Sequence, residues 1–196
     1  DGGAGTTDTL TVSSSFTDLS LDTISNVETV VATTAISMST AQHTAFTTIS
    51  NVAISLTDAG TVAAKAGNAI YNLANGTNTF TASSTAVNNN VTGGSGADTF
   101  NFGQTSLSAN VFDVNDTVAG GTGTDTLILT GGTTATDILT VSPLNSIERI
   151  VFTTGNTPTP SFAGAALNGQ SIVLSEIIPA GQATAAITYV IAAGDV

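Results

Sequence analysis

Two glycine-rich turns of the sequence end in an aspartate and lead directly into a strand-like run. They read GGSGADTFN at 93–101 and GGTGTDTLI at 120–128. Glycine adopts tight turn conformations that other residues resist. A hard cation such as Ca²⁺ prefers carboxylate and carbonyl oxygens, and both kinds are concentrated in such a turn. The turns therefore predict calcium ligands among the following residues: Gly93, Gly94, Ser95, Gly96, Asp98, Gly121, Gly123 and Asp125.

Weaker copies of the same pattern occur elsewhere in the chain. GGAGTTDTL at 2–10 carries one extra threonine ahead of Asp8. VFDVNDTVA at 111–119 fits the nine-residue frame between the two full copies and supplies Asp113 and Asp116. We add these three aspartates to the candidate ligands. The alternative for each turn is a plain turn whose aspartate caps its own backbone.

The charge balance favours cations over other partners. Only 8% of the 196 residues are charged, against about 25% in an average soluble protein, and the net charge is −12. Such a chain repels nucleic acid and anionic membrane surfaces and attracts divalent cations. No apolar run approaches the roughly 18 residues that cross a membrane, so we expect no membrane insertion. The absence of cysteine removes disulfides and leaves the compartment open.

Internal repetition indicates the fold. TISNV occurs at 23–27 and again at 48–52, and the runs at 8–12 and 24–34 are echoed at 125–129 and 144–154. Repeating units of this kind cannot bury their apolar face alone and must stack on one another. The runs are short, rich in Thr and Val, and separated by Gly and Asn turns, which favours strands. The sequence therefore predicts an all-β fold, a parallel β-solenoid (β-roll or β-helix).

We divide the chain into two parts. Residues 1–154 are predicted to form the β-solenoid with the calcium-binding repeats. Residues 155–196 hold three of the four prolines and several apolar runs, and they are predicted to form a less regular C-terminal β segment for capping or assembly. The stretch 59–74 could hold a short helix. Because the chain opens inside a repeat, we expect a trimmed piece of a longer protein.

The nonapeptides at 93–101 and 120–128, with NDTV at 115–118 between them, resemble the calcium-binding repeats of repeats-in-toxin (RTX) proteins. These proteins are exported by type I secretion. The surrounding Thr/Gly/Asn-rich blocks with ISNVE resemble bacterial surface-layer (S-layer) proteins and large adhesins that use such repeats. The resemblance implies that two nonapeptides make one coil of a parallel β-roll. It also implies that Ca²⁺ lies between turns stacked one coil apart, held by the repeat aspartates and by turn carbonyls.

The resemblance carries over only in part. A coil of two nonapeptides places Asp98 and Asp116 on the same edge, one coil apart, where they would share an ion with the carbonyls of 93–96. Asp125 then falls on the opposite edge, and the position one coil earlier is Leu107, which is no ligand. Longer coils would remove this mismatch. The spacing of 25 between the TISNV copies indicates that some coils are longer.

The asparagines and glutamates of the repeats have structural alternatives. Asn26, Asn51 and Asn75 either form an internal ladder at one corner of the stacked coils or face solvent from turns. Glu28 and Glu148 occupy the same strand-corner motif. We expect them to be solvated edge acids and not metal ligands.

Catalysis has little support in the sequence. It contains no Gly-x-Ser-x-Gly elbow, no zinc-binding His pair and no phosphate loop. His43 has no Cys, Asp or Glu near it in sequence and is expected to be solvent-exposed or structural. Tyr71 is expected in the core and not in a sugar-binding platform. We therefore expect no enzyme activity.

The sequence favours a calcium-dependent extracellular structural protein, secreted to the cell surface as an S-layer, adhesin or filament. Its expected partners are further copies of the chain, joined through calcium, and a cell-surface polysaccharide. The alternative is an RTX β-roll fragment of a secreted protease or lipase that aids export and folding. A third interpretation, an ice-binding or sugar-binding module, predicts a flat Thr-x-Thr array, which only Thr77, Thr79 and Thr81 suggest.

Overall fold

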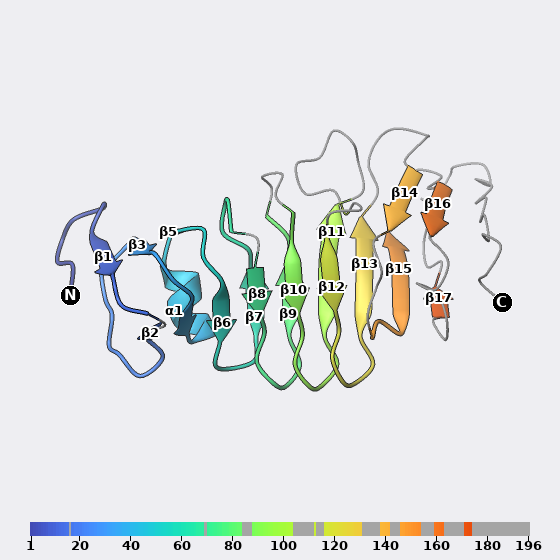
Figure 1. Cartoon of the computed structure of the whole chain (residues 1–196), viewed down its shortest axis with the longest axis horizontal. Coiled ribbons are helices and arrows are strands. Elements are labelled where there is room, and N and C mark those ends of the chain that lie inside the picture. The colour runs from blue at the N-terminus through green and yellow to red at the C-terminus, as the bar shows by residue number, and fades with distance from the viewer. Residues whose placement is uncertain are drawn as a thin grey trace.

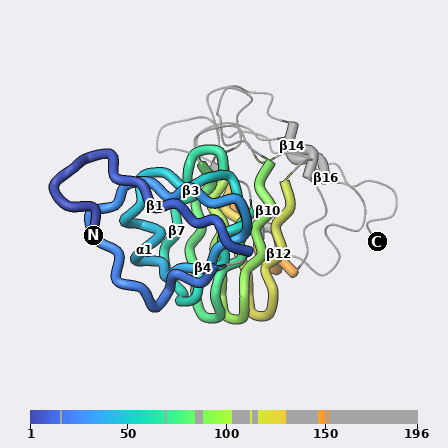
Figure 2. Tube along the Cα trace, turned by 60° about the vertical axis from the view of Figure 1, so that its left-hand side comes forward, coloured from blue at the N-terminus to red at the C-terminus, as the bar shows by residue number. Residues whose placement is uncertain are grey.

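A computed structural model shows the chain as a β-solenoid of stacked parallel sheets, which confirms the predicted fold class (Figure 1). It describes residues 1–15, 17–68, 70–83, 88–103, 112, 116–130, 138–141, 146–153, 159–162 and 171–173. Every strand pair among them is parallel. Figure 2, turned from that view, shows successive coils lying beside one another.

The described strands form four sheets. The first sheet contains β1 (Thr9–Val12), β3 (Thr29–Ala32) and β5 (Thr48–Ile49). The second contains β2 (Thr17–Asp18), β4 (Ile36–Met38), β6 (Ile54–Leu56), β8 (Ile70–Asn72), β10 (Asn90–Thr92) and β12 (Thr117–Ala119). The third contains β7 (Thr61–Ala63), β9 (Thr79–Thr81), β11 (Thr99–Gly103), β13 (Thr126–Thr130), β15 (Arg149–Thr153) and β17 (Ser171–Val173). The fourth pairs β14 (Ile138–Val141) with β16 (Thr159–Phe162).

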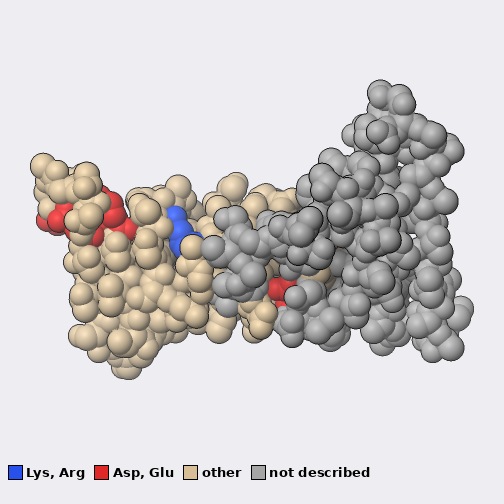
Figure 3. Space-filling model, turned by 90° about the horizontal axis from the view of Figure 1, so that it is seen from above, with Lys and Arg blue, Asp and Glu red and all other residues tan. Residues whose placement is uncertain are grey.

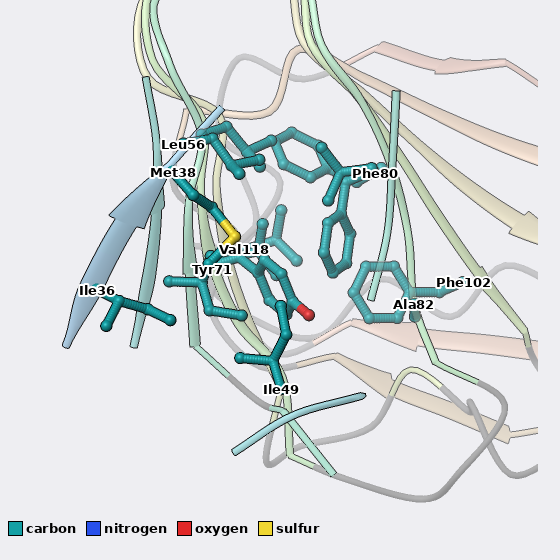
Figure 4. Close-up of a cluster of buried hydrophobic side chains, with 14 of the residues drawn as sticks. Ile36, Met38, Ile49, Leu56, Tyr71, Phe80, Ala82, Phe102 and Val118 are labelled. Carbon is teal, nitrogen blue, oxygen red and sulfur yellow. The ribbon is translucent and has the colours of Figure 1, made fainter. Parts of the chain in front are cut away.

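The core forms because side chains alternate between the two faces of each strand. Apolar residues at one register face inward and lie above one another in successive coils. The fully buried columns are Ile36, Ile54, Tyr71, Val91 and Val118 in the second sheet, and Val62, Phe80, Phe100 and Leu127 in the third. Figure 4 shows part of this cluster. Aromatic rings also contact one another inside the core, with the ring centroids of Tyr71 and Phe80 5.2 Å apart and those of Phe102 and Phe112 5.0 Å apart.

The coils differ in length. Residues bonded across neighbouring coils are 17 apart in sequence between Ser55 and Asn72, and 27 apart between Asp98 and Asp125. The strands keep their register while the connections between them vary. A fixed coil of 18 residues therefore does not describe this solenoid.

The described residues include one helix among the strands, α1 (Thr40–Ala45). It begins at Ser39, whose side chain and Gln42 form a capping box, which satisfies backbone N–H groups of the first turn. Gln42 donates to the Leu19 carbonyl at 2.6 Å, so the helix is tied to the coil before it. The stretch 59–74, which could have held a short helix, contains β7 and β8 joined by turns in its described part and no helix there.

The C-terminal part contributes strands where it is described. β16 pairs with β14, and β17 pairs with β15, both in parallel. Residues 174–196 lie outside the described residues. In the described part of the chain, no helix has the length and apolar character needed to cross a membrane.

Candidate metal centre

Five residues in successive coils occupy one position, directly ahead of the strands of the third sheet. We call them the third-sheet column. Its members are Gly60, Asn78, Asp98, Asp125 and Glu148, which precede β7, β9, β11, β13 and β15. The strand register stacks them, so that polar side chains from distant parts of the sequence lie along one corner of the solenoid.

Each polar side chain of the third-sheet column accepts the backbone N–H of the member before it. Asn78 accepts from Gly60 at 3.2 Å, and Asp98 accepts from Asn78 at 2.8 Å. Asp125 accepts from Asp98 at 2.8 Å, and Glu148 accepts from Asp125 at 2.8 Å. Bonds from N–H to carboxylate are stronger than neutral ones, so these side chains fasten coil to coil.

The glycines of the repeat allow the turns to stack backbone on backbone. Ser95 and Thr122 form a parallel bridge between the two turns. A Cβ at Gly121 would collide with the carbonyl oxygen of Gly94, and one at Gly123 would collide with that of Gly96. Both Gly121 and Gly123 also have positive φ, +101° and +143°. The turn therefore requires glycine at these positions whether or not an ion is bound.

The same arrangement occurs at two other corners. Ahead of β10 and β12, Asn89 donates both its backbone N–H and its side-chain Nδ2 to Oδ1 of Asp116, at 2.7 and 3.0 Å. Ahead of β1 and β3, the backbone N–H of Asp8 donates to Oε2 of Glu28 at 2.9 Å. The aspartates of the glycine turns thus belong to three separate columns.

The predicted pairing of Asp98 with Asp116 is wrong. Asp98 leads into the third sheet and Asp116 into the second, and the neighbour of Asp98 one coil on is Asp125. The reason is the length of this coil, which spans 27 residues where the family pattern implies 18. Asp113 lies outside the described residues.

Asp125 combines full burial with an unsatisfied carboxylate oxygen. It is fully buried, and its Oδ2 has no hydrogen-bond partner among the described residues. Burial raises the pKa of Asp125, and the charges of Asp98 and Glu148 raise it further against the lowering effect of the Asp98 N–H. A buried carboxylate in this position binds either a proton or a cation.

The chemistry of the donors fits calcium in part. They are all oxygens, which Ca²⁺ prefers, and Oδ2 of Asp125 is free to bind. Oδ1 and Oδ2 of Asp98 already accept N–H groups, the latter from Gly94 at 3.1 Å. In the described residues no three acidic or imidazole side chains converge on one point. An ion at Asp125 would therefore need carbonyl oxygens of the stacked turns as most of its ligands.

Two distant segments build the same local structure. Asn26 and Ser146 have φ of +52° and +53°, and each lies two residues ahead of the glutamate of its column. A Cβ at Gly2 would collide with the Asn26 carbonyl oxygen, as one at Gly120 would with that of Ser146. Oδ2 of Asp8, like that of Asp125, is buried without a hydrogen-bond partner. The block repeat seen in the sequence is therefore a structural duplication.

The duplicated glutamates have a function that the sequence interpretation missed. Glu28 and Glu148 are half-buried and bind the backbone N–H of the aspartate one coil earlier. They are neither solvated edge acids nor, by this geometry, free to serve as metal ligands through Oε2. The signal in the sequence was the repeated order of an Asp ahead of one strand and a Glu ahead of a later one, 20 residues apart in the first block and 23 in the second.

Of the two alternatives for Asn26, Asn51 and Asn75, the structure supports the solvent-facing one and not the internal ladder. Asn26, Asn51 and Asn75 are exposed. Asn26 donates to Asp1 at 2.9 Å, and Asn75 accepts the backbone N–H of Ser95 at 3.1 Å. The internal ladder is instead formed by the columns, in which Asn78 and Asn89 each take part.

His43 and Tyr71 lie in the core. This confirms the expectation for Tyr71 and, of the two alternatives for His43, the structural one. Their rings meet edge to face with centroids 5.7 Å apart. The hydroxyl of Tyr71 accepts the backbone N–H of Lys65 at 2.8 Å, and burial raises the pKa of Tyr71 to about 12. These polar groups serve the packing of α1 against the coils.

Comparisons of the chain with protein-family models, with curated proteins and with solved structures find no match.

Proposed function

We propose that this chain is a calcium-dependent extracellular structural protein, built into a cell-surface layer or an adhesin-type assembly, with no catalytic role. The observation that carries the proposal is the third-sheet column. It stacks Asp98, Asp125 and Glu148 in consecutive coils in a chain with 14 acidic and two basic residues. A fold of this kind needs cations from its surroundings to offset the repulsion between its carboxylates.

The mechanism is linkage between binding and folding. Calcium that binds the stacked turns of the folded chain, and not the unfolded chain, stabilises the solenoid in proportion to its concentration. Extracellular calcium sites need dissociation constants of only about 10⁻⁴ to 10⁻³ M. Secretion into calcium would then turn a loosely folded chain into a rigid one at its place of use.

The repetition of the architecture supports a structural function. In the described third sheet, successive coils place buried apolar residues at the same inward register and polar residues at the corner ahead of the strands. The RTX resemblance of 93–101 and 120–128 supports type I secretion and extracellular use. A cell-surface polysaccharide stays a proposed further partner.

The threonines give weaker support to an ice-binding surface. The outward-facing pairs along the third sheet are Thr61/Ala63, Thr79/Thr81, Thr99/Asn101 and Thr126/Ile128. The first column is all threonine, but the second is not. A flat array of Thr-x-Thr is thus present on β9 alone among these four strands.

Calcium titration tests the proposal directly. We expect the far-ultraviolet circular dichroism signal and the melting temperature to rise with calcium in the millimolar range and to fall with chelator. Magnesium at the same concentration controls for ionic strength and should have a smaller effect. A chelated protein that keeps its full β signal and its melting temperature would remove calcium from the proposed function.

A further inference from the structure

The turn at 73–78 is a further copy of the glycine turns, in which an asparagine takes the place of the aspartate. The strand register stacks LANGTNTFT at 73–81 on GGSGADTFN at 93–101, one coil later. A hydrogen bond of 3.1 Å between the turns joins the side chain of Asn75 to the backbone N–H of Ser95. Asn78 therefore occupies the position of the repeat aspartate.

The side-chain amide of Asn78 is surrounded by three oxygens. Its Nδ2 donates to the carbonyls of Ala74 and Gly76 at 2.8 and 3.0 Å and to Oδ1 of Asp98 at 2.8 Å. Its Oδ1 accepts the backbone N–H of Gly60, which fixes the orientation of the amide. Turn carbonyls and a carboxylate are also the ligands that Ca²⁺ prefers. The NH₂ group thus gathers oxygens that a cation would otherwise bind.

One coil further on, a carboxylate stands where this amide would be. Oδ1 of Asp98 accepts both N–H donors of Asn78, and its Oδ2 accepts the backbone N–H of Gly94. Among the described residues, Asp125 accepts only the backbone N–H of Asp98, and its buried Oδ2 has no partner. Asp98 has no side-chain donor to offer, and its negative charge acts against that of Asp125. The need for a cation therefore arises between Asp98 and Asp125.

The second sheet repeats the pairing of asparagine with aspartate at another corner. Asn89 precedes β10 and donates its backbone N–H and its Nδ2 to Oδ1 of Asp116, at 2.7 and 3.0 Å. Both residues are 1% exposed. The same two donors therefore bind the same kind of carboxylate oxygen in two separate columns, which makes the pairing a feature of the fold.

The chain has few basic side chains that could neutralise buried carboxylates. Lys65 and Arg149 stand against 14 acidic residues, and the face of the molecule in Figure 3 carries little blue. Arg149 is exposed and Lys65 is half-buried. Buried carboxylates are costly unless a donor or a cation compensates them. An amide supplies donors from within the chain, whereas calcium must come from solution.

We infer that the amide of Asn78 replaces a calcium ion in the third-sheet column. The turn at 73–78 then stacks on the turn at 93–98 without calcium, whereas the stacking of 93–98 on 120–125 depends on calcium. The first of these turns is a calcium-independent template on which calcium orders the later glycine turns. The inference rests on the proposed function, because it names the step of the solenoid at which calcium acts.

Hydrogen exchange in the wild-type chain tests the inference at two backbone N–H groups. That of Asn78 bonds to Asp98, and that of Asp98 bonds to Asp125, so the two report on consecutive steps of one column. When millimolar calcium replaces chelator, we expect the protection of the Asp98 N–H to rise about tenfold or more and that of Asn78 to change less than about twofold. Equal increases at both groups would overturn the inference and leave the proposed function standing. No increase at either group would overturn both.

Asn78→Asp replaces the NH₂ group by an oxygen and should create a calcium site. It keeps the acceptor for Gly60 and places a second carboxylate beside Asp98. Asn75→Asp is the matched control, because it adds the same charge at an exposed position of the same turn and keeps its acceptor for Ser95. By isothermal titration calorimetry, we expect Asn78→Asp to bind about one calcium ion more per chain than wild type, and Asn75→Asp to bind the same number as wild type.

The stability of the two variants completes the test. In chelator, Asn78→Asp should melt at a lower temperature than Asn75→Asp, because only Asn78→Asp buries an uncompensated charge. Calcium should remove most of this difference. An unchanged number of bound ions in Asn78→Asp would overturn the inference, and so would a failure of calcium to restore its folding.

Discussion

The backbone N–H of Asp98 donates a 2.8 Å hydrogen bond to Oδ1 of Asp125, which lies 27 residues later in the chain and one coil further along the solenoid. Asp125 repeats this relationship with Glu148. The aspartate of each glycine turn therefore caps the turn before it. Hydrogen bonds between coils hold these carboxylates in the folded chain, and an ion that binds this corner would stabilise the folded chain further.

A double-mutant cycle separates the two possible partners of Asp98. We expect Asp98→Ala and Asp125→Ala to be coupled by about 0.5–3 kcal/mol in the free energy of unfolding, because the two carboxylates lie in adjacent coils of one column and the charge of Asp98 acts on Asp125. Asp98→Ala and Asp116→Ala should be additive to within about 0.5 kcal/mol, because they lie in different columns. Urea unfolding in calcium measures both pairs. Coupling confined to Asp98 and Asp116 would restore the shorter coil of the family pattern.

Two glycines with similar backbone conformations distinguish turn strain from stacking. Gly121 and Gly3 have φ of +101° and +89°, but a Cβ at Gly121 would meet the Gly94 carbonyl, whereas one at Gly3 has nothing within 4 Å. Gly3→Ala should cost about 1–2 kcal/mol for its left-handed conformation. Gly121→Ala should cost clearly more, because the backbone of the previous coil must also move. Equal losses in chemical denaturation would mean that the turns do not stack closely.

The fold was predictable because its signals are local. Alternating apolar residues such as Val91 and Phe100, with glycine turns between the runs, indicate strands that must stack. The coil length was not predictable, because it depends on the loops between the strands. Such surface loops can vary in length without disturbing the stacked strands. Without the coil length, the partner of Asp98 and the acceptor function of Glu28 could not be assigned.

The sequence contains a local signal for the start of α1. Ser39 and Gln42 have the spacing of a capping box, which marks the start of a helix. The helix has only six residues, four of which are Thr or Ala, so no 3.6-residue apolar period could develop. His43 is buried because it belongs to this helix, so its burial could not be predicted without the helix.

Neutralising the buried carboxylate should separate its charge from its hydrogen bond. Asp125→Asn keeps an acceptor for the N–H of Asp98 and removes a charge that burial disfavours, as the raised pKa of Asp125 indicates. In chelator we therefore expect a higher free energy of unfolding than in wild type, and in calcium a smaller gain. Asp22→Asn, at an exposed position outside the columns, is the control for net charge. Suppose instead that Asp125→Asn is less stable than wild type in chelator and gains as much stability from calcium as wild type does. Asp125 would then act only as a hydrogen-bond acceptor for Asp98 and not as a calcium ligand.

The imidazole of His43 should make the solenoid sensitive to acid. His43 is 1% exposed, its Nε2 has no hydrogen-bond partner among the described residues, and burial, with a smaller contribution from Lys65, lowers its pKa from 6.5 to about 4. The folded chain thus binds this proton less tightly than the unfolded chain. The resulting stabilisation is complete above pH 6.5 and is lost as the pH falls from 6.5 through 4, at a cost of up to about 3 kcal/mol. His43→Phe cannot be protonated and keeps an aromatic ring against Tyr71. Because carboxylates also titrate in acid, the test is the difference between the two proteins in urea unfolding from pH 7 to pH 4, and parallel curves would contradict the prediction.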